Sequence, residues 1–209
     1  MPAVVKAHFV NVTLKNTRIL FYLSIANVLV CALIFFFSFS GITDILTDIL
    51  LAEYCLTFIL TLFYFIRILL CFNEATAVVA AYSMFTCLLA ISFITIAFPR
   101  LLSEAYSTWL ATLTEVVCLL TAFRSFFVKA AAVRLPFRLF GAGLGLVVLP
   151  RILMLLIATH INEDLISTTS NLGLLIILFS TVFILKRMMD FQKTEVLPPA
   201  MEEQEPSPL

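Results

Sequence analysis

Two charged residues, Glu115 and Arg151, lie inside long apolar stretches of the sequence. The stretch 140–160 carries Arg151 near its middle and is long enough to cross a bilayer, because roughly 20 residues span the hydrocarbon. An arginine at that depth costs roughly 2.5–3.5 kcal/mol unless a partner or water compensates it. Glu115 lies near the middle of the preceding apolar stretch, so the two side chains lie at similar depths. They are predicted to form an intramembrane charge pair.

This predicted pair has two interpretations. In the first, Glu115 and Arg151 only hold two neighbouring helices together, because pairing is the usual way in which charge is tolerated inside a membrane. In the second, they line a polar track for ions, protons or lipid headgroups. Arg67, near the end of another apolar stretch, is a further membrane charge that such a track would use. The residue types leave both interpretations open.

Side-chain combinations typical of enzymes are absent from the sequence. Its two histidines, His8 and His160, are predicted on opposite sides of the membrane, and no nucleophile motif, zinc motif or paired-carboxylate arrangement accompanies them. None of the five cysteines belongs to a CxxC pair. The sequence therefore predicts that the protein is not an enzyme and binds no metal and no cofactor.

A glycine-rich segment precedes Pro150 in the stretch 140–160. A nucleotide-binding loop is not expected there, because no strand precedes the segment and it opens an apolar span. Gly141 and Gly145, four residues apart, instead fit close packing against a neighbouring helix. Pro150 predicts a kink, because proline removes a helix hydrogen bond.

The composition determines the class of protein that must carry these residues. Hydrophobic residues make up 62 % of the 209-residue chain and charged residues 12 %, with a mean hydropathy of +1.11. Soluble domains carry about 25 % charged residues. Because the apolar runs are continuous rather than alternating, they predict an all-α, polytopic membrane protein and not a barrel. The formal net charge of zero argues against a nucleic-acid partner.

The apolar runs divide the chain into six predicted transmembrane helices, which form one domain over residues 19–185. Their predicted ranges are 19–40, 51–72, 77–98, 105–124, 139–160 and 165–185. Residues 1–18 form a basic tail, and residues 42–53 are predicted to be a short acidic connection at the membrane interface. Residues 186–209 are acidic, rich in proline and poor in apolar side chains, so disorder is expected.

The distribution of lysine and arginine predicts the orientation of these helices. Most of these residues fall on the side that holds both chain ends: Lys6, Lys15, Arg18, Arg124, Lys129, Arg134, Arg138, Lys186, Arg187 and Lys193. Arg67 is an eleventh if its side chain extends to the nearer membrane boundary. The other side receives only Arg100. Positive charge in short loops marks the cytosolic side, so both termini are expected in the cytosol. The plasma membrane and the endomembranes (ER or Golgi) are equally compatible with this pattern.

The segment between the fourth and fifth predicted helices is the most basic of the chain. Four cations are expected to contact anionic lipid there: Arg124, Lys129, Arg134 and Arg138. This basic segment, together with residues 149–155 (LPRILML), resembles part of the XK-related lipid scramblases over less than a tenth of the chain. The resemblance implies lipid transport. Membrane lipids are thus the expected partners, and a homo-oligomer or a second membrane protein stays open.

Two functions from different classes remain. The first is a small transporter, channel or lipid scramblase that uses the charges within its helices. The second is a non-catalytic accessory or scaffold protein, in which the same charges only lock helices together and the tails recruit partners. Few polar residues in the membrane favour the second, and the central position of Glu115 and Arg151 favours the first. The sequence slightly favours transport.

Overall fold

The computed structural model describes residues 12–40, 44–97, 104–157 and 163–196, and these residues form six α-helices. The helices are α2 (Leu14–Ser40), α3 (Asp44–Cys71), α4 (Thr76–Ala97), α5 (Glu104–Ser125), α6 (Arg134–Ile157) and α7 (Glu163–Val196). Each contains a segment long and apolar enough to cross a membrane. The all-helical prediction with six spans is therefore confirmed for the described residues, and it supports a multi-pass membrane protein.

Four helices, α2, α3, α6 and α7, extend two or more residues beyond their predicted ranges, and α6 begins at Arg134 rather than at residue 139. α2 begins at Leu14 because Thr13 caps it, with the Thr13 hydroxyl accepting a hydrogen bond from the Asn16 backbone N–H at 3.2 Å. α3 begins at Asp44, so the predicted acidic connection is helical from that residue on. Carboxylates in a first turn stabilise a helix through its dipole.

The predicted boundary of the C-terminal tail was wrong. α7 continues past Leu185 to Val196. Met188, Met189 and Gln192 are buried in this segment, and their burial stabilises the helix. The expectation of disorder therefore fails for residues 186–196. The rest of that tail, like residues 1–11, lies outside the described residues.

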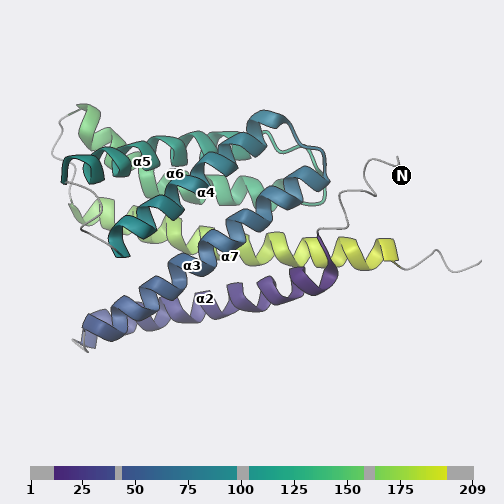
Figure 1. Ribbon diagram of the computed structural model, residues 1–209, viewed down its shortest axis with the longest axis horizontal. Coiled ribbons are helices and arrows are strands. Elements are labelled where there is room, and N and C mark those ends of the chain that lie inside the picture. Colours follow the sequence, from purple (N-terminus) through teal and green to yellow (C-terminus); the bar gives the residue numbers. More distant parts are fainter. Residues whose placement is uncertain (1–11, 41–43, 98–103, 158–162, 197–209) are drawn as a thin grey trace, which may run out of the picture.

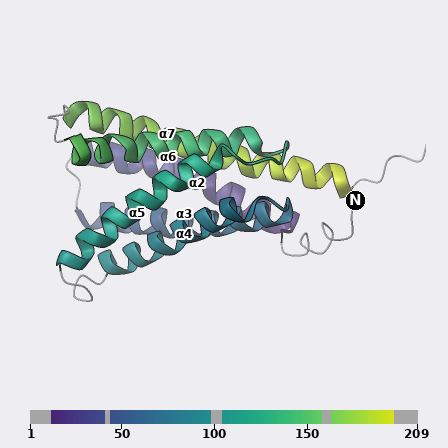
Figure 2. The same ribbon diagram turned by 90° about the horizontal axis from the view of Figure 1, so that it is seen from above.

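The six helices form a closed ring. Within the described residues, each helix packs against the helices that precede and follow it in the chain, and α2 closes the ring by packing against α7. Figure 1 shows α7 running along the whole length of the molecule. Seen from above in Figure 2, α6 and α7 lie on one side, α3 and α4 on the other, and α5 crosses between them.

Both described ends of the chain lie at the same end of the ring. The Gln192 side-chain amide, near the end of α7, donates a hydrogen bond of 2.6 Å to the Val12 backbone carbonyl, just before α2. This end also holds the α3–α4 turn and the α5–α6 loop, and we call it the basic end after its lysines and arginines. The first and last described residues thus lie on one side of the ring, and the cytosolic orientation of the termini stays a prediction.

The turn between α3 and α4 ends α3 sharply. Asn73 adopts a left-handed conformation with φ of 52°, which asparagine tolerates better than most residues. The backbone N–H groups of Glu74 and Asn73 donate to the carbonyls of Leu69 and Leu70, each at 3.0 Å. These two bonds form a Schellman motif that satisfies the last carbonyls of α3.

The buried core occupies only the half of the ring next to the basic end, which we call the core half. Large side chains that are less than 2 % exposed include Phe65, Tyr82, Phe137, Phe140 and Met188. The other half is loosely packed, and none of its described residues is buried. This loosely packed half comprises residues 28–34, 49–56, 87–95, 106–116, 149–153 and 164–172. In Figure 1, the end of α2 and the start of α3 lie at the lower left, whereas the start of α5 lies at the upper left.

Glycines bring α6 close to both of its neighbours, although not in the predicted pairing. A Cβ atom at Gly141 would lie 2.6 Å from the Ala122 carbonyl oxygen of α5. The prediction for Gly145 was wrong, because a Cβ there meets nothing within 4 Å. Gly143 has that role instead, since its Cβ would lie 2.9 Å from the carbonyl oxygen of Gly173 on α7. Gly141 and Gly143 lie on different faces of α6, so Gly141 allows the close contact with α5 and Gly143 the close contact with α7.

Replacing Gly143 with alanine should therefore destabilise the protein by about 1–3 kcal/mol, the usual cost of overpacking a tight interface. The measurement is the thermal unfolding midpoint in detergent. Gly145→Ala is the matched control, and it should leave the midpoint unchanged or raise it slightly, because alanine favours a helix over glycine. Equal midpoints for the two variants would contradict the close contact at Gly143.

Candidate functional site

Arg151 extends the inward-facing stripe of α6 into the loosely packed half. It follows Phe137, Phe140, Leu144 and Val148 at spacings of three and four residues, which places all five side chains on one helix face. The first four are buried, whereas the Arg151 side chain is 56 % exposed. Arg151 therefore lies on the α6 face that carries the buried core residues, at the level where this face is no longer buried.

Glu115 has the same relation to α5. It precedes Cys118, Ala122 and Ser125 at spacings of three and four residues, and these three residues are buried. A Cβ at Gly141 would touch Ala122 and Ser125, so this stripe faces α6. Moving along this stripe of α5 from Ser125 toward the start of the helix, Glu115 is thus the first residue that is not buried.

The structure brings the two predicted charges together. The Arg151 Nη1 atom lies 3.6 Å from the Glu115 Oε1 atom, and the Glu115 side chain is 25 % exposed. This is a single contact at the long end of the ion-pair range, not the two-point pairing of which a guanidinium is capable. One residue before Glu115, the Thr114 hydroxyl lies 3.3 Å from the Ser92 hydroxyl and connects α5 to α4.

An aromatic cluster separates this charge pair from the basic end. It comprises Phe58 and Phe65 of α3, Tyr82 of α4, and Phe137 and Phe140 of α6. Ring centroids of Phe65 lie 5.3 Å from Phe137 and 5.4 Å from Phe140. Such edge-to-face contacts stabilise a core beyond its area burial. They fill the middle of the ring between helices whose backbones are not direct neighbours.

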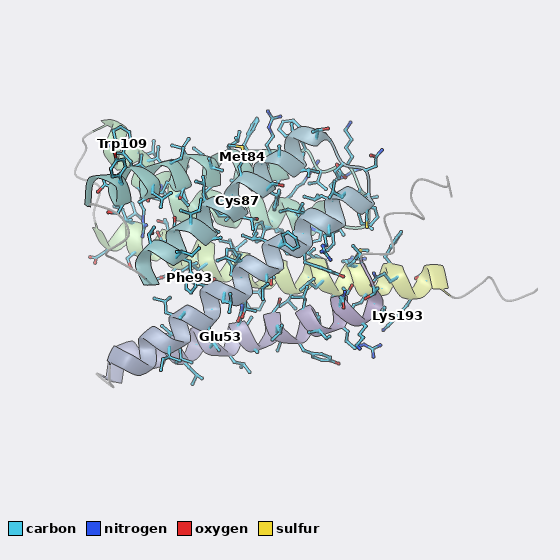
Figure 3. The ribbon with its side chains drawn as sticks, in the orientation of Figure 1. Glu53, Met84, Cys87, Phe93, Trp109 and Lys193 are labelled. Carbon is cyan, nitrogen blue, oxygen red and sulfur yellow. The ribbon has the colours of Figure 1, made fainter. Side chains whose placement is uncertain are left out.

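Side chains around the ring show the contrast between the two halves. In Figure 3, Glu53 of α3, Phe93 of α4 and Trp109 of α5 lie in the loosely packed half, and Lys193 marks the basic end of α7. Trp109 is 74 % exposed, whereas Tyr82 in the core half is fully buried. The described side chains in the loosely packed half are therefore more exposed than those in the core half.

Two other predicted site residues do not join the charge pair. Arg67 lies in the last turns of α3, and its guanidinium stacks on the Phe63 ring at 5.0 Å. Phe63 is an exposed residue four positions earlier, so Arg67 points away from the inward stripe of α3. Pro150 lies inside α6, which continues to Ile157. Its ring leaves the Leu146 carbonyl without the usual helix donor, next to Arg151.

The cations that were predicted to contact lipid lie in and around the loop between α5 and α6, which we call the basic loop: Lys129 is in the loop, Arg124 is in the last turn of α5, and Arg134 and Arg138 are in the first turns of α6. Lys129, Arg134 and Arg138 are exposed and Arg124 is half-buried. The guanidinium groups of Arg134 and Arg138 donate to the Lys129 and Phe126 carbonyls at 2.9 and 3.2 Å, which orders the loop. Exposed phenylalanines accompany the cations, namely Phe123, Phe126 and Phe127.

Glu74 is a site residue that the sequence analysis missed. Its carboxylate is 8 % exposed and accepts hydrogen bonds from the Lys129 backbone N–H at 2.9 and 3.0 Å and from the Ala130 N–H at 2.6 Å. It thereby joins the α3–α4 turn to the basic loop. The available signal was a lone acid in a short turn on the side that otherwise carries lysine and arginine.

The chain matches no protein-family model, no curated protein and no solved structure. The described residues contain no group of three or more His, Cys, Asp or Glu side chains placed to hold a metal ion. Functional inference therefore depends on the geometry of the ring, the charge pair and the basic loop.

Replacing Glu74 with alanine should lower stability by roughly 1–3 kcal/mol for each backbone donor left without an acceptor. Thermal unfolding in detergent measures this loss, and limited proteolysis should show earlier cleavage between residues 126 and 133. Asp190→Ala, which removes an exposed carboxylate near the same end, is the control. If Glu74→Ala unfolds at the wild-type midpoint, the loop does not depend on this anchor.

Proposed function

We propose that the protein is a small membrane transport protein, with the Glu115–Arg151 pair lining its polar path. The observation that carries the proposal is the position of Arg151. It lies on the same α6 face as Phe137 and Phe140, yet more than half of its side chain is exposed. A purely structural pair is expected to be well packed, because a buried charge needs complete compensation.

The two halves of the ring support an alternating mechanism. The aromatic cluster closes the interior toward the basic end, while the interior remains loosely packed on the other side. Transport proteins that alternate between states need one closed and one accessible side of a central site. In this proposal, Arg151 attracts an anionic group of the solute or of a lipid headgroup, and Glu115 keeps the guanidinium in place when the site is empty.

The basic loop is proposed to contact anionic lipid at the surface of the membrane. Lys129, Arg134 and Arg138 supply exposed positive charge, and Phe126 and Phe127 supply exposed aromatic rings beside it. Each cation near an anionic leaflet contributes about 1 kcal/mol of attraction. The Glu74 anchor holds the loop that carries Phe126, Phe127 and Lys129, and Arg134 and Arg138 follow in the first turns of α6.

A specific observation also favours the second candidate, a non-catalytic accessory protein. Glu115 and Arg151 join α5 and α6, which are consecutive neighbours in the ring, and a charge pair between neighbours is what a structural staple requires. If this candidate is right, removal of the charge pair should impair folding rather than activity.

Reconstitution into liposomes should separate the two candidates. Chloride efflux, followed with a halide-sensitive dye, tests anion transport, and dithionite quenching of a fluorescent phospholipid tests lipid transport. We expect Arg151→Leu to keep the wild-type unfolding midpoint and to slow whichever flux the wild type shows by roughly tenfold or more, equivalent to about 1.4 kcal/mol.

Arg67→Leu is the control, because it removes a membrane charge that lies outside the ring interior. A variant Arg151→Leu that fails to fold, while Arg67→Leu folds, would favour the accessory protein. If liposomes containing the wild-type protein show neither chloride efflux nor lipid transport faster than liposomes without protein, the result would contradict transport of anions and of lipids.

A further inference from the structure

The N-terminal helix α2 turns polar side chains inward and apolar side chains outward. Thr17, Ser24 and Asn27 are all less than 5 % exposed. The opposite face carries exposed apolar or aromatic residues: Ile19, Tyr22, Ile25, Leu29 and Leu33. Such a pattern is typical of a helix that borders a polar interior, because polar groups in membrane helices face protein or water.

A hydrogen-bond network fixes how α2 aligns with α3 and α7. The Thr17 hydroxyl lies 2.6 Å from the Tyr64 hydroxyl of α3 and donates to the Gln192 side-chain carbonyl of α7 at 2.9 Å. The Gln192 amide group donates to the Val12 carbonyl at 2.6 Å. All of these groups are buried, and they define the basic end of a seam between the three helices.

Helix periodicity continues this seam away from the network. Ser24 is seven residues beyond Thr17, and Thr57 is seven residues before Tyr64, so both lie about 10 Å from the network. Similar counting from Thr17 and Gln192 places Asn27 of α2 and Thr181 of α7 about 15–17 Å from it. Seven and eleven residues are close to two and three whole helical turns, so Ser24, Thr57 and Thr181 face the same side as the network. Asn27 lies three residues beyond Ser24, on the adjoining part of the same buried face of α2.

Three oxygen atoms in this seam are buried without a hydrogen-bond partner in the described part of the chain. They are Ser24 Oγ, Asn27 Oδ1 and Thr181 Oγ1, on side chains that are 3 %, 4 % and 6 % exposed. Neighbouring hydroxyls are satisfied, as Ser180 donates to the Ile177 carbonyl at 3.0 Å. Buried polar groups without partners cost free energy, and ordered water is the usual remedy.

We propose that the seam between α2, α3 and α7 binds ordered water at Ser24, Asn27 and Thr181. Water fits better than an ion, because the three oxygen atoms belong to uncharged groups that offer both donors and acceptors. The exposed Glu53 accepts a hydrogen bond from Thr57 at 3.0 Å and marks the end of the seam in the loosely packed half. The seam is thus a polar path separate from the Glu115–Arg151 pair, and independent of the transport proposal.

The experiment compares thermal unfolding midpoints of the full-length protein in detergent. Thr181→Val and Ser24→Ala each remove one partner of the bound water, so each should lower the midpoint. The triple variant Ser24→Ala, Asn27→Leu, Thr181→Val removes the need for water and should recover much of the loss. Ser180→Ala is the matched control, because its hydroxyl is buried next to Thr181 and already satisfied within α7.

The sign of the shift decides the outcome. A higher midpoint for each single variant would mean that the oxygen atoms are dry and that the proposal is wrong. A second comparison, wild type in sodium chloride against choline chloride at equal ionic strength, tests for an ion. If the midpoint rises specifically in sodium chloride, and Thr181→Val abolishes this rise, the seam binds a cation rather than water. That result would also overturn the proposal.

Discussion

A charge inside a bilayer must face protein or water, and this constraint determines how the ring has to be built around Glu115 and Arg151. Both residues occupy the inward stripes of their helices, one turn past the last buried side chain. Further toward the basic end, the same stripes carry Ala122, Phe137 and Phe140, which need a dry, tightly packed core. The boundary between apolar and charged residues along these stripes coincides with the boundary between the two halves of the ring.

The two halves differ in what holds them together. In the core half, aromatic contacts, the Thr17 network and the Glu74 anchor join segments that are distant in sequence. In the part of the chain that the structure describes, the loosely packed half is joined by contacts between neighbouring helices, such as the one between the Ser92 and Thr114 hydroxyls. Regions with few buried contacts open at lower free energy than the rest of a structure. Movement of the helices should therefore begin in the loosely packed half.

Much of this arrangement could be predicted from the sequence, because length and depth follow from hydrophobicity and helix rise. Six spans and the nearness of Glu115 to Arg151 needed only such counting. The end of α7 could not be predicted, since Met188 and Gln192 are helical through contacts with other helices. The glycine pairing failed for a similar reason: which of Gly143 and Gly145 faces α7 depends on helix rotation, not on spacing.

Polar residues that act through distant partners were harder to recognise. Serine and threonine occur in many membrane helices, so Ser24 and Thr181 gave no signal until the register of α2 against α7 was known. The role of Glu74 likewise depends on a loop more than fifty residues away. The sequence identified Glu115 and Arg151 because charge is rare within a membrane span, whereas neutral polar groups such as Ser24 and Thr181 are common there and gave no comparable signal.

The most direct test asks whether water reaches position 151 from inside the ring. Arg151→Cys and Val116→Cys, each in a chain with the five native cysteines replaced by alanine, would be treated with a membrane-impermeant thiol reagent on the side opposite the basic end. Val116 is 54 % exposed, close to the 56 % of Arg151, and lies next to Glu115, but it points away from the inward stripe of α5. The ring described above predicts rapid modification of position 151 and none of position 116, which faces lipid. Equal labelling of both positions, or labelling of position 116 alone, would contradict it.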